Sequence, residues 1–152
     1  MRVAFRIVGV VCLLALAACS SDNSERFVAG LSGLSEVPPL PGVLASGIAN
    51  FDATESQIDY SITVQNITGV TDVQLRSGAP GEVGPAIADL YNGPTTGAIA
   101  SGTLTSGVIS ASGLTAISLD SLKVLMRNGK AYVNLTTTAQ PNGEIRGQII
   151  PN

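Results

Sequence analysis

Strict alternation of apolar and polar residues over positions 57–65 is the feature that most limits how this chain can fold. The apolar members are Ile58, Tyr60, Ile62 and Val64, and every residue between them is polar. Because successive side chains of a β-strand point to opposite faces, the segment predicts a strand with one face in a core. Half-buried strands of this kind are typical of antiparallel sheets.

Shorter alternating segments recur along the chain, separated by glycine, proline and asparagine. This pattern predicts an all-β fold, an antiparallel, Greek-key-like sandwich or barrel. The sequence Pro141-Asn142-Gly143 predicts the turn between the last two strands, because Asn-Gly tolerates the positive φ of tight hairpins. Further strands are expected at 26–33, 47–53, 71–76, 86–90, 98–104, 108–111, 130–137 and 144–150.

Residues 119–128 break this pattern and predict one short helix. Their large apolar residues recur at helical spacing, and they are Leu119, Leu122, Leu125 and Met126. Ser118 is a suitable N-cap, and Asn128-Gly129 is a suitable C-terminal stop. We expect the helix to lie across one end of the sheet with its apolar stripe against the core.

The N-terminus has the features of a bacterial lipoprotein signal. Two arginines precede an apolar run from Ile7 to Ala18, which is shorter than the roughly 20 residues of a membrane span. The run ends in Leu16-Ala17-Ala18-Cys19, where the cysteine thiol can carry a diacylglycerol before cleavage. We expect a signal peptide over 1–18, lipidation at Cys19, a polar tether over 19–26 and a β domain over 27–152.

These features predict a location in the cell envelope, with the domain held at a lipid bilayer by acylated Cys19. Ser20-Ser21 places no aspartate directly after the cysteine. By analogy with lipoproteins in general, the outer membrane is therefore expected if the host is Gram-negative. A single acyl chain gives only marginal binding, so two or more chains are needed for firm attachment.

Charge excludes two kinds of partner. Removal of Arg2 and Arg6 with the signal leaves six basic residues against eleven acidic ones, a formal charge of −5. No basic patch is available to neutralise phosphates, so we expect no nucleic-acid partner. Electrostatic attachment to anionic lipids is excluded for the same reason.

The residue inventory also predicts that the domain is not an enzyme. The chain has no histidine, and its two cysteines are Cys12 in the signal and Cys19 at the lipid site. Catalysis through Ser-His-Asp or Cys-His is therefore excluded. We expect no catalytic residue, no metal and no cofactor.

An ordered set of short motifs resembles the CHRD domain, a module named after chordin that is common in bacterial surface proteins. Each motif alone is weak, but the set covers nearly the whole mature chain and ends in a quite specific Gly-Glu-x-Arg-Gly-Gln sequence. Its members are Leu31-Ser32-Gly33 with Glu36-Val37-Pro38-Pro39, Gly47, Phe51, Asn66 to Thr71, Gly78 to Gly81, Gly84-Pro85, Leu90, Gly129, Tyr132-Val133-Asn134 and Gly143 to Ile149.

The chain departs from the CHRD pattern at three positions where the family usually carries histidine. These positions hold Gln74, Arg76 and Thr136. Three imidazoles on neighbouring strands could hold a metal, much as in copper–zinc superoxide dismutases, which the family resembles in outline. Glutamine and threonine are poor substitutes, and arginine adds a permanent positive charge.

Alternation places these three residues and Asn134 on outer strand faces, where we expect a surface cluster facing solvent. Arg76 is expected to pair with Asp89 or Glu82. Arg146, two residues beyond Glu144 on one strand face, is expected to reach Glu36 in a structural contact.

Two functions are compatible with these residues. The first is a membrane-anchored, non-enzymatic β module that binds or adheres to an envelope or extracellular component, either protein or polysaccharide. The alternative is a degenerate relative of a metal-binding or redox β-sandwich that retains a small-molecule site. The missing histidines disfavour the alternative.

Overall fold

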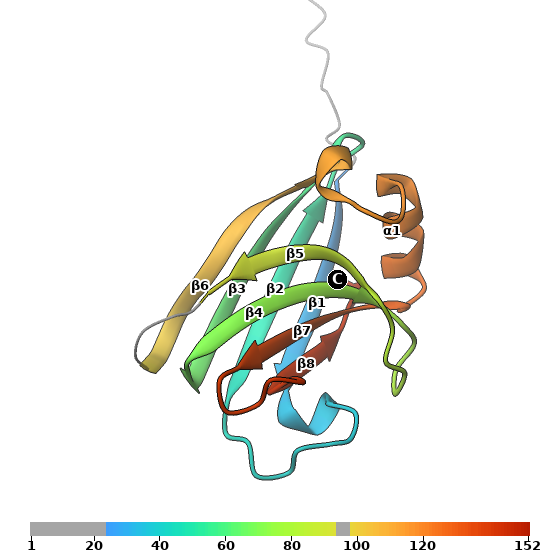
Figure 1. Cartoon of the computed structure of the whole chain (residues 1–152). Helices are drawn as coiled ribbons and strands as arrows, with labels where there is room; N and C mark the ends of the chain where they lie inside the picture. The colour runs from blue at the N-terminus through green and yellow to red at the C-terminus, as the bar shows by residue number, and fades with distance from the viewer. Residues whose placement is uncertain (1–23, 94–97) are drawn as a thin grey trace, which may run out of the picture.

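The computed structural model describes residues 24–93 and 98–152, which form one antiparallel sheet curled into a nearly closed barrel (Figure 1). The predicted all-β fold is confirmed. The strand order is β5-β4-β7-β8-β1-β2-β3-β6, and a short ninth strand pairs with β1. The strands are β1 (Glu25–Ser32), β2 (Ser46–Ala53), β3 (Gln57–Thr68), β4 (Val70–Ser77), β5 (Ala86–Asn92), β6 (Ala98–Ser110), β7 (Ala131–Thr137), β8 (Ile145–Gln148) and β9 (Ile150–Pro151).

The strand β3 contains the alternation from which the fold was predicted. Ile58, Ile62 and Val64 are fully buried, as expected. Tyr60 is only partly buried, because its ring lies near the seam between the two edge strands, β5 and β6. Its hydroxyl crosses that seam and donates to the Leu90 carbonyl oxygen of β5 at 2.7 Å. The tyrosine hydroxyl thereby gives one backbone carbonyl oxygen of the open edge strand β5 a hydrogen-bond partner.

The strand β6 corrects the sequence analysis, which predicted two strands at 98–104 and 108–111. The structure has one strand over Ala98–Ser110, with a register shift opposite Ile62 and Thr63. The glycine at 107, interpreted as punctuation, is instead a point of close approach. A Cβ there would lie 2.8 Å from the Tyr60 hydroxyl oxygen, so the missing side chain leaves room for the tyrosine.

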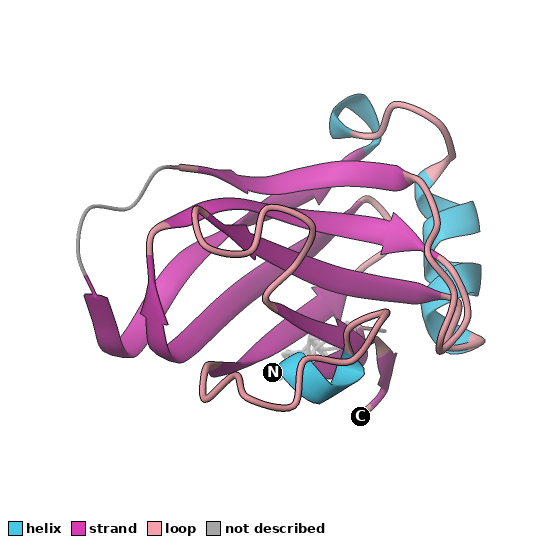
Figure 2. Ribbon diagram, turned by 60° about the horizontal axis from the view of Figure 1, so that its bottom comes forward, coloured by secondary structure: helices cyan, strands magenta, loops and turns pink. Residues whose placement is uncertain are grey.

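The predicted helix is confirmed as α1 (Leu119–Arg127), which lies at one end of the barrel (Figure 2). The Ser118 hydroxyl caps it by accepting from the Ser121 N–H at 3.2 Å. Leu122 and Met126 are completely buried against the core. Lys123 is also buried, and its Nζ donates to the Thr54 carbonyl oxygen in the turn between β2 and β3. Two single-turn 3-10 helices complete the fold, η1 (Gly33–Ser35) and η2 (Ala111–Gly113).

The first strand, β1, starts at Glu25, one residue before the strand predicted at 26–33. Glu25 forms a two-pronged ion pair with Arg127 at the end of α1. The expected signal peptide, Cys19 and most of the tether lie outside the described residues. Among the residues that are described, no helix is long and apolar enough to cross a membrane.

Candidate functional site

Strand register places the residues at the family histidine positions, together with Asn134 and Arg146, on one outer face of three adjoining strands. On β4, Gln74 lies opposite Asn134 of β7, and Asn134 lies opposite Arg146 of β8. Arg76 lies opposite Tyr132 in the same ladder, and Asp72 lies opposite Thr136. Alternate residues of each strand therefore share this face, while Val73, Val133 and Leu135 between them are fully buried in the core.

This outer face, where a solvent-facing cluster was predicted, is hollowed into a cleft. All three residues at the family histidine positions line a cleft of about 580 Å³, within the range of small-molecule sites. Asn134 beside them is buried, with 7% of its surface exposed, whereas Gln74, Arg76 and Thr136 are partly exposed. Two loops form much of the rim of the cleft. One follows η1 and contains Glu36 to Pro38, and the other contains Val83 before β5.

Arg146 is the most deeply buried cation of the cleft, with 2% of its surface exposed. Its guanidinium carbon lies 3.5 Å from the centroid of the Tyr132 ring, a stacked cation–π contact. Its NH2 donates to the Ala79 carbonyl oxygen at 3.3 Å. Arg146 is close enough to Glu36 to act on its charge, although the described residues contain no direct ion pair between them.

Glu36 instead contacts Asn134, whose Nδ2 donates to both carboxylate oxygens at 3.2 Å. Glu36 is 6% exposed, and this burial raises the pKa of its carboxyl above the usual value. Arg146 is close enough to oppose the rise, together with hydrogen bonds from Val37 and Asn134. The Glu36 loop therefore has a structural partner, but the partner is Asn134.

Arg76 also lacks the carboxylate partner that was predicted. Its Nε donates to the Gly84 carbonyl oxygen at 2.9 Å, and its NH1 donates to Gln74 Oε1 at 2.7 Å. Gln74 in turn donates from Nε2 to Asp89 Oδ1 at 3.2 Å. Gln74 thus connects Arg76 to Asp89, and the guanidinium makes no direct ion pair in the described part of the chain.

Asp72 marks the opposite end of the cleft from Arg76, and sequence analysis missed it. Burial and the neighbouring charge of Asp89 raise the pKa of its carboxyl. Its Oδ1 is buried and has no hydrogen-bond partner among the described residues. Alternation with Gln74 and Arg76 was the available sequence signal, since residue 72 has the same parity on the strand.

The three family histidine positions share the cleft but do not meet at one point. Thr136 lies opposite Asp72, four residues along the strand from Arg76. At about 3.3 Å per residue, the positions of Thr136 and Arg76 are therefore about 13 Å apart along the strand direction. Within the described residues, no group of three His, Cys, Asp or Glu side chains is placed to hold a metal ion.

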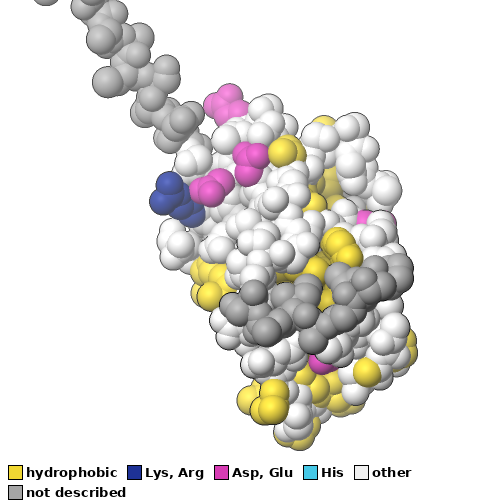
Figure 3. Space-filling view, turned by 90° about the vertical axis from the view of Figure 1, so that its left-hand side faces the viewer, with side chains coloured by type: hydrophobic (Ala, Val, Ile, Leu, Met, Phe, Trp, Pro, Cys, Tyr) yellow, Lys and Arg dark blue, Asp and Glu magenta, His cyan; other side chains and the backbone are white. Residues whose placement is uncertain are grey.

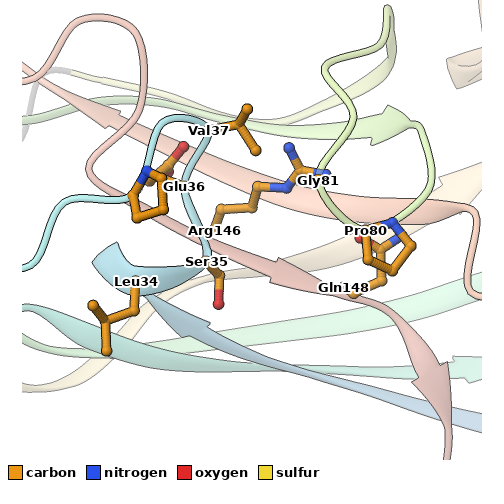
Figure 4. A pocket seen from close by; sticks show the side chains of 9 residues that line it. Leu34, Ser35, Glu36, Val37, Pro80, Gly81, Arg146 and Gln148 are labelled. Atoms are coloured by element: carbon orange, nitrogen blue, oxygen red, sulfur yellow. The ribbon is translucent and has the colours of Figure 1, made fainter.

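A second cavity of about 400 Å³ adjoins the cleft and shares Glu36, Val37 and Arg146 with it. Its lining is mainly apolar and includes Leu34, Pro39 and Pro80. Figure 4 shows the Arg146 side chain extending from β8 into the space between Val37 of one loop and Gly81 of the other. One buried guanidinium therefore forms part of the wall of both cavities.

Comparison with known proteins identifies one family. The model of this family, described as the CHRD domain, matches residues 27–149. No curated protein and no solved structure matches the chain. The matched span includes β1 from its third residue through β8, and with them every residue of the cleft.

Proposed function

Because this chain belongs to the CHRD domain family, we propose that it is a lipid-anchored envelope protein whose barrel binds an envelope or extracellular component without catalysing a reaction. The observation that supports binding is the cleft on the outer face of β4, β7 and β8. It combines guanidinium, carboxylate, amide and hydroxyl groups in a concave space bordered by loops. Such a group of convergent polar side chains in a concave site is typical of ligand recognition.

The alternative function, a degenerate metal or redox domain, is favoured only in its weaker form, as a small-molecule site. The cleft occupies the family histidine positions, so a place for a ligand remains there. Its residues do not suit a transition metal, because Gln74 and Thr136 offer weak oxygen ligands and Arg76 repels cations. Both functions therefore depend on the same cleft and differ in the size of the partner.

Blocking the cleft tests whether it is the binding site. Asn142 is exposed and lines the cleft, so Asn142→Trp should fill it without disturbing the core. We expect the variant to be retained on washed envelope fragments several-fold less than the natural protein. Asn50→Trp is the matched control, because Asn50 is exposed on β2 away from the cleft. Equal retention of all three proteins would exclude the cleft as the binding site.

Replacement of the lipidated cysteine tests the anchor. Cys19→Ala removes the thiol that carries the diacylglycerol, so we expect no labelling by a palmitate analogue and a shift from the membrane pellet to the soluble fraction. Fractionation with and without signal-peptidase inhibition measures both effects. Recovery of the alanine variant in the pellet, processed or not, would mean that another segment attaches the protein.

A further inference from the structure

We propose that the cleft binds a uronic acid unit of an acidic polysaccharide, with its carboxylate held between Arg76 and Arg146. This inference rests on the proposed binding function and specifies the chemical class of the ligand. It depends on three properties of the cleft: guanidinium groups with unused donors, a set of neutral polar side chains, and strands with no free edge.

The guanidinium groups have donors that the protein does not use. A guanidinium offers five N–H groups in a planar fork that matches a carboxylate. Arg146 uses one nitrogen, to Ala79, and Arg76 uses two, to Gly84 and Gln74. Neither forms an ion pair within the described residues, although Arg146 is almost fully buried. A buried cation is costly unless it is paired, and a ligand carboxylate would add a direct partner to the nearby charge of Glu36.

The rest of the cleft suits the hydroxyl groups of a sugar. Gln74, Asn134, Thr136 and Asn142 contribute neutral amides and a hydroxyl, which can each donate or accept. The remaining lining is more polar than that of the neighbouring cavity, which carries Leu34, Pro39 and Pro80. A volume of about 580 Å³ accommodates a ligand of one or two sugar rings.

The sheet topology disfavours a peptide in this position. Extended peptides commonly bind by adding a strand to a free sheet edge. The cleft lies on β4, β7 and β8, and each of these strands has a neighbour on both sides. Their backbone groups are therefore committed to the sheet, and recognition must come from side chains, as it does for the hydroxyl and carboxylate groups of a saccharide.

Two carboxylates in the cleft, Glu36 and Asp72, would repel a bound anion, and their surroundings weaken this repulsion. Both oxygens of Glu36 are occupied by Asn134, and Asp72 lies at the far end from Arg76. Burial raises the pKa of both carboxyls, so each takes up a proton more readily than an exposed group. A proton on either one would remove its repulsion of the bound uronate.

The positive charge that would attract a uronate is confined to the cleft, because the chain as a whole is acidic. In the view from the β6 side, the charged side chains gather mostly at one end, and the rest of this face is mainly uncharged (Figure 3). Long-range attraction of an acidic glycan is therefore not expected, and binding should depend on short-range hydrogen bonds to the two arginines.

Titration calorimetry of the detergent-purified protein with glucuronate and glucose tests the inference, because these sugars differ only in the oxidation state of C6. We expect glucuronate to bind in about the millimolar range and glucose to bind at least about tenfold more weakly, since charge-assisted hydrogen bonds to the carboxylate are lost. Arg76→Gln should weaken glucuronate by about tenfold or more. Arg26→Gln is the matched control, because it removes the same charge from an exposed site outside the cleft.

The other outcomes distinguish this inference from the proposed function. Acetate binding as tightly as glucuronate would show a simple anion site and overturn the assignment to a sugar. Tighter binding of tri-alanine, which has a free carboxylate, would assign the cleft to peptides instead. No glucuronate binding, combined with loss of envelope retention in Asn142→Trp, would overturn the uronate and leave the binding function intact. Unchanged binding by both Arg76→Gln and Arg146→Lys would place the sugar elsewhere.

Discussion

Replacement of Tyr132 with alanine should lower the free energy of unfolding by about 4 kcal/mol, the middle of the range for truncating a large buried aromatic side chain. The Tyr132 ring is 1% exposed and lies under the Arg146 guanidinium. Its removal leaves a cavity and also takes away the aromatic face that stabilises a buried cation with no direct ion pair among the described residues. Denaturation by urea, followed by circular dichroism, measures the loss.

Tyr132→Phe is the matched variant, because it keeps the ring and removes only the hydroxyl. That oxygen accepts from the Gly84 N–H at 3.1 Å, and the hydroxyl donates to the Gly84 carbonyl oxygen at 3.5 Å. We expect a cost of about 1 kcal/mol for their loss, because the second bond is long. If alanine costs no more than phenylalanine, the ring does not support the loop or the arginine. The cleft would then be held together by its hydrogen bonds alone.

The fold was largely predictable because its main signals are local. Alternation over residues 57–65 identifies β3 and its buried face, and helical spacing with a serine cap identifies α1. The error at β6 has a non-local cause. Gly107 reads as a break in the sequence, but its role depends on the Tyr60 ring of a neighbouring strand, and spacing along the chain does not reveal that contact.

The candidate site was predictable only in part. Parity along β4 and β7 places Gln74, Arg76 and Thr136 on the outer face, and the register confirms a shared face. Alternation predicts which side of a strand a residue occupies, but not whether a loop covers that side. The loop after η1 carries Glu36 onto Asn134, ninety-eight positions away, and so forms one side of the cleft.

The partners of the two cleft arginines were wrong for a related reason. Sequence analysis paired each cation with a carboxylate of opposite charge, Arg76 with Asp89 or Glu82 and Arg146 with Glu36. The structure gives them carbonyl oxygens, an amide and an aromatic ring instead. Charge complementarity identifies candidate partners, but the loop backbone decides which acceptors come within reach.

Replacement of Gly147 with alanine should destabilise the barrel by about 3 kcal/mol, because the added methyl group meets backbone atoms that cannot rotate away. Gly147 lies in β8, and a Cβ there would lie 2.4 Å from the carbonyl oxygen of Gly30 in β1. The missing side chain is what lets these two strands approach at the junction between the two halves of the sheet. The glycine before Gln148 in the motif thus has a packing role.

Gly30→Ala is the control for this prediction, because it adds the same methyl group on the other side of the same contact. A Cβ on Gly30 meets nothing within 4 Å, so we expect its alanine variant to be neutral or slightly stabilising. Thermal unfolding of both variants gives the comparison. If the two alanines have similar effects, the cost lies in backbone flexibility and not in the approach of β8 to β1. A large loss of stability confined to Gly147→Ala would instead mean that β8 and β1 can lie this close only because residue 147 has no side chain. The same spacing helps to place Arg146 in the cleft.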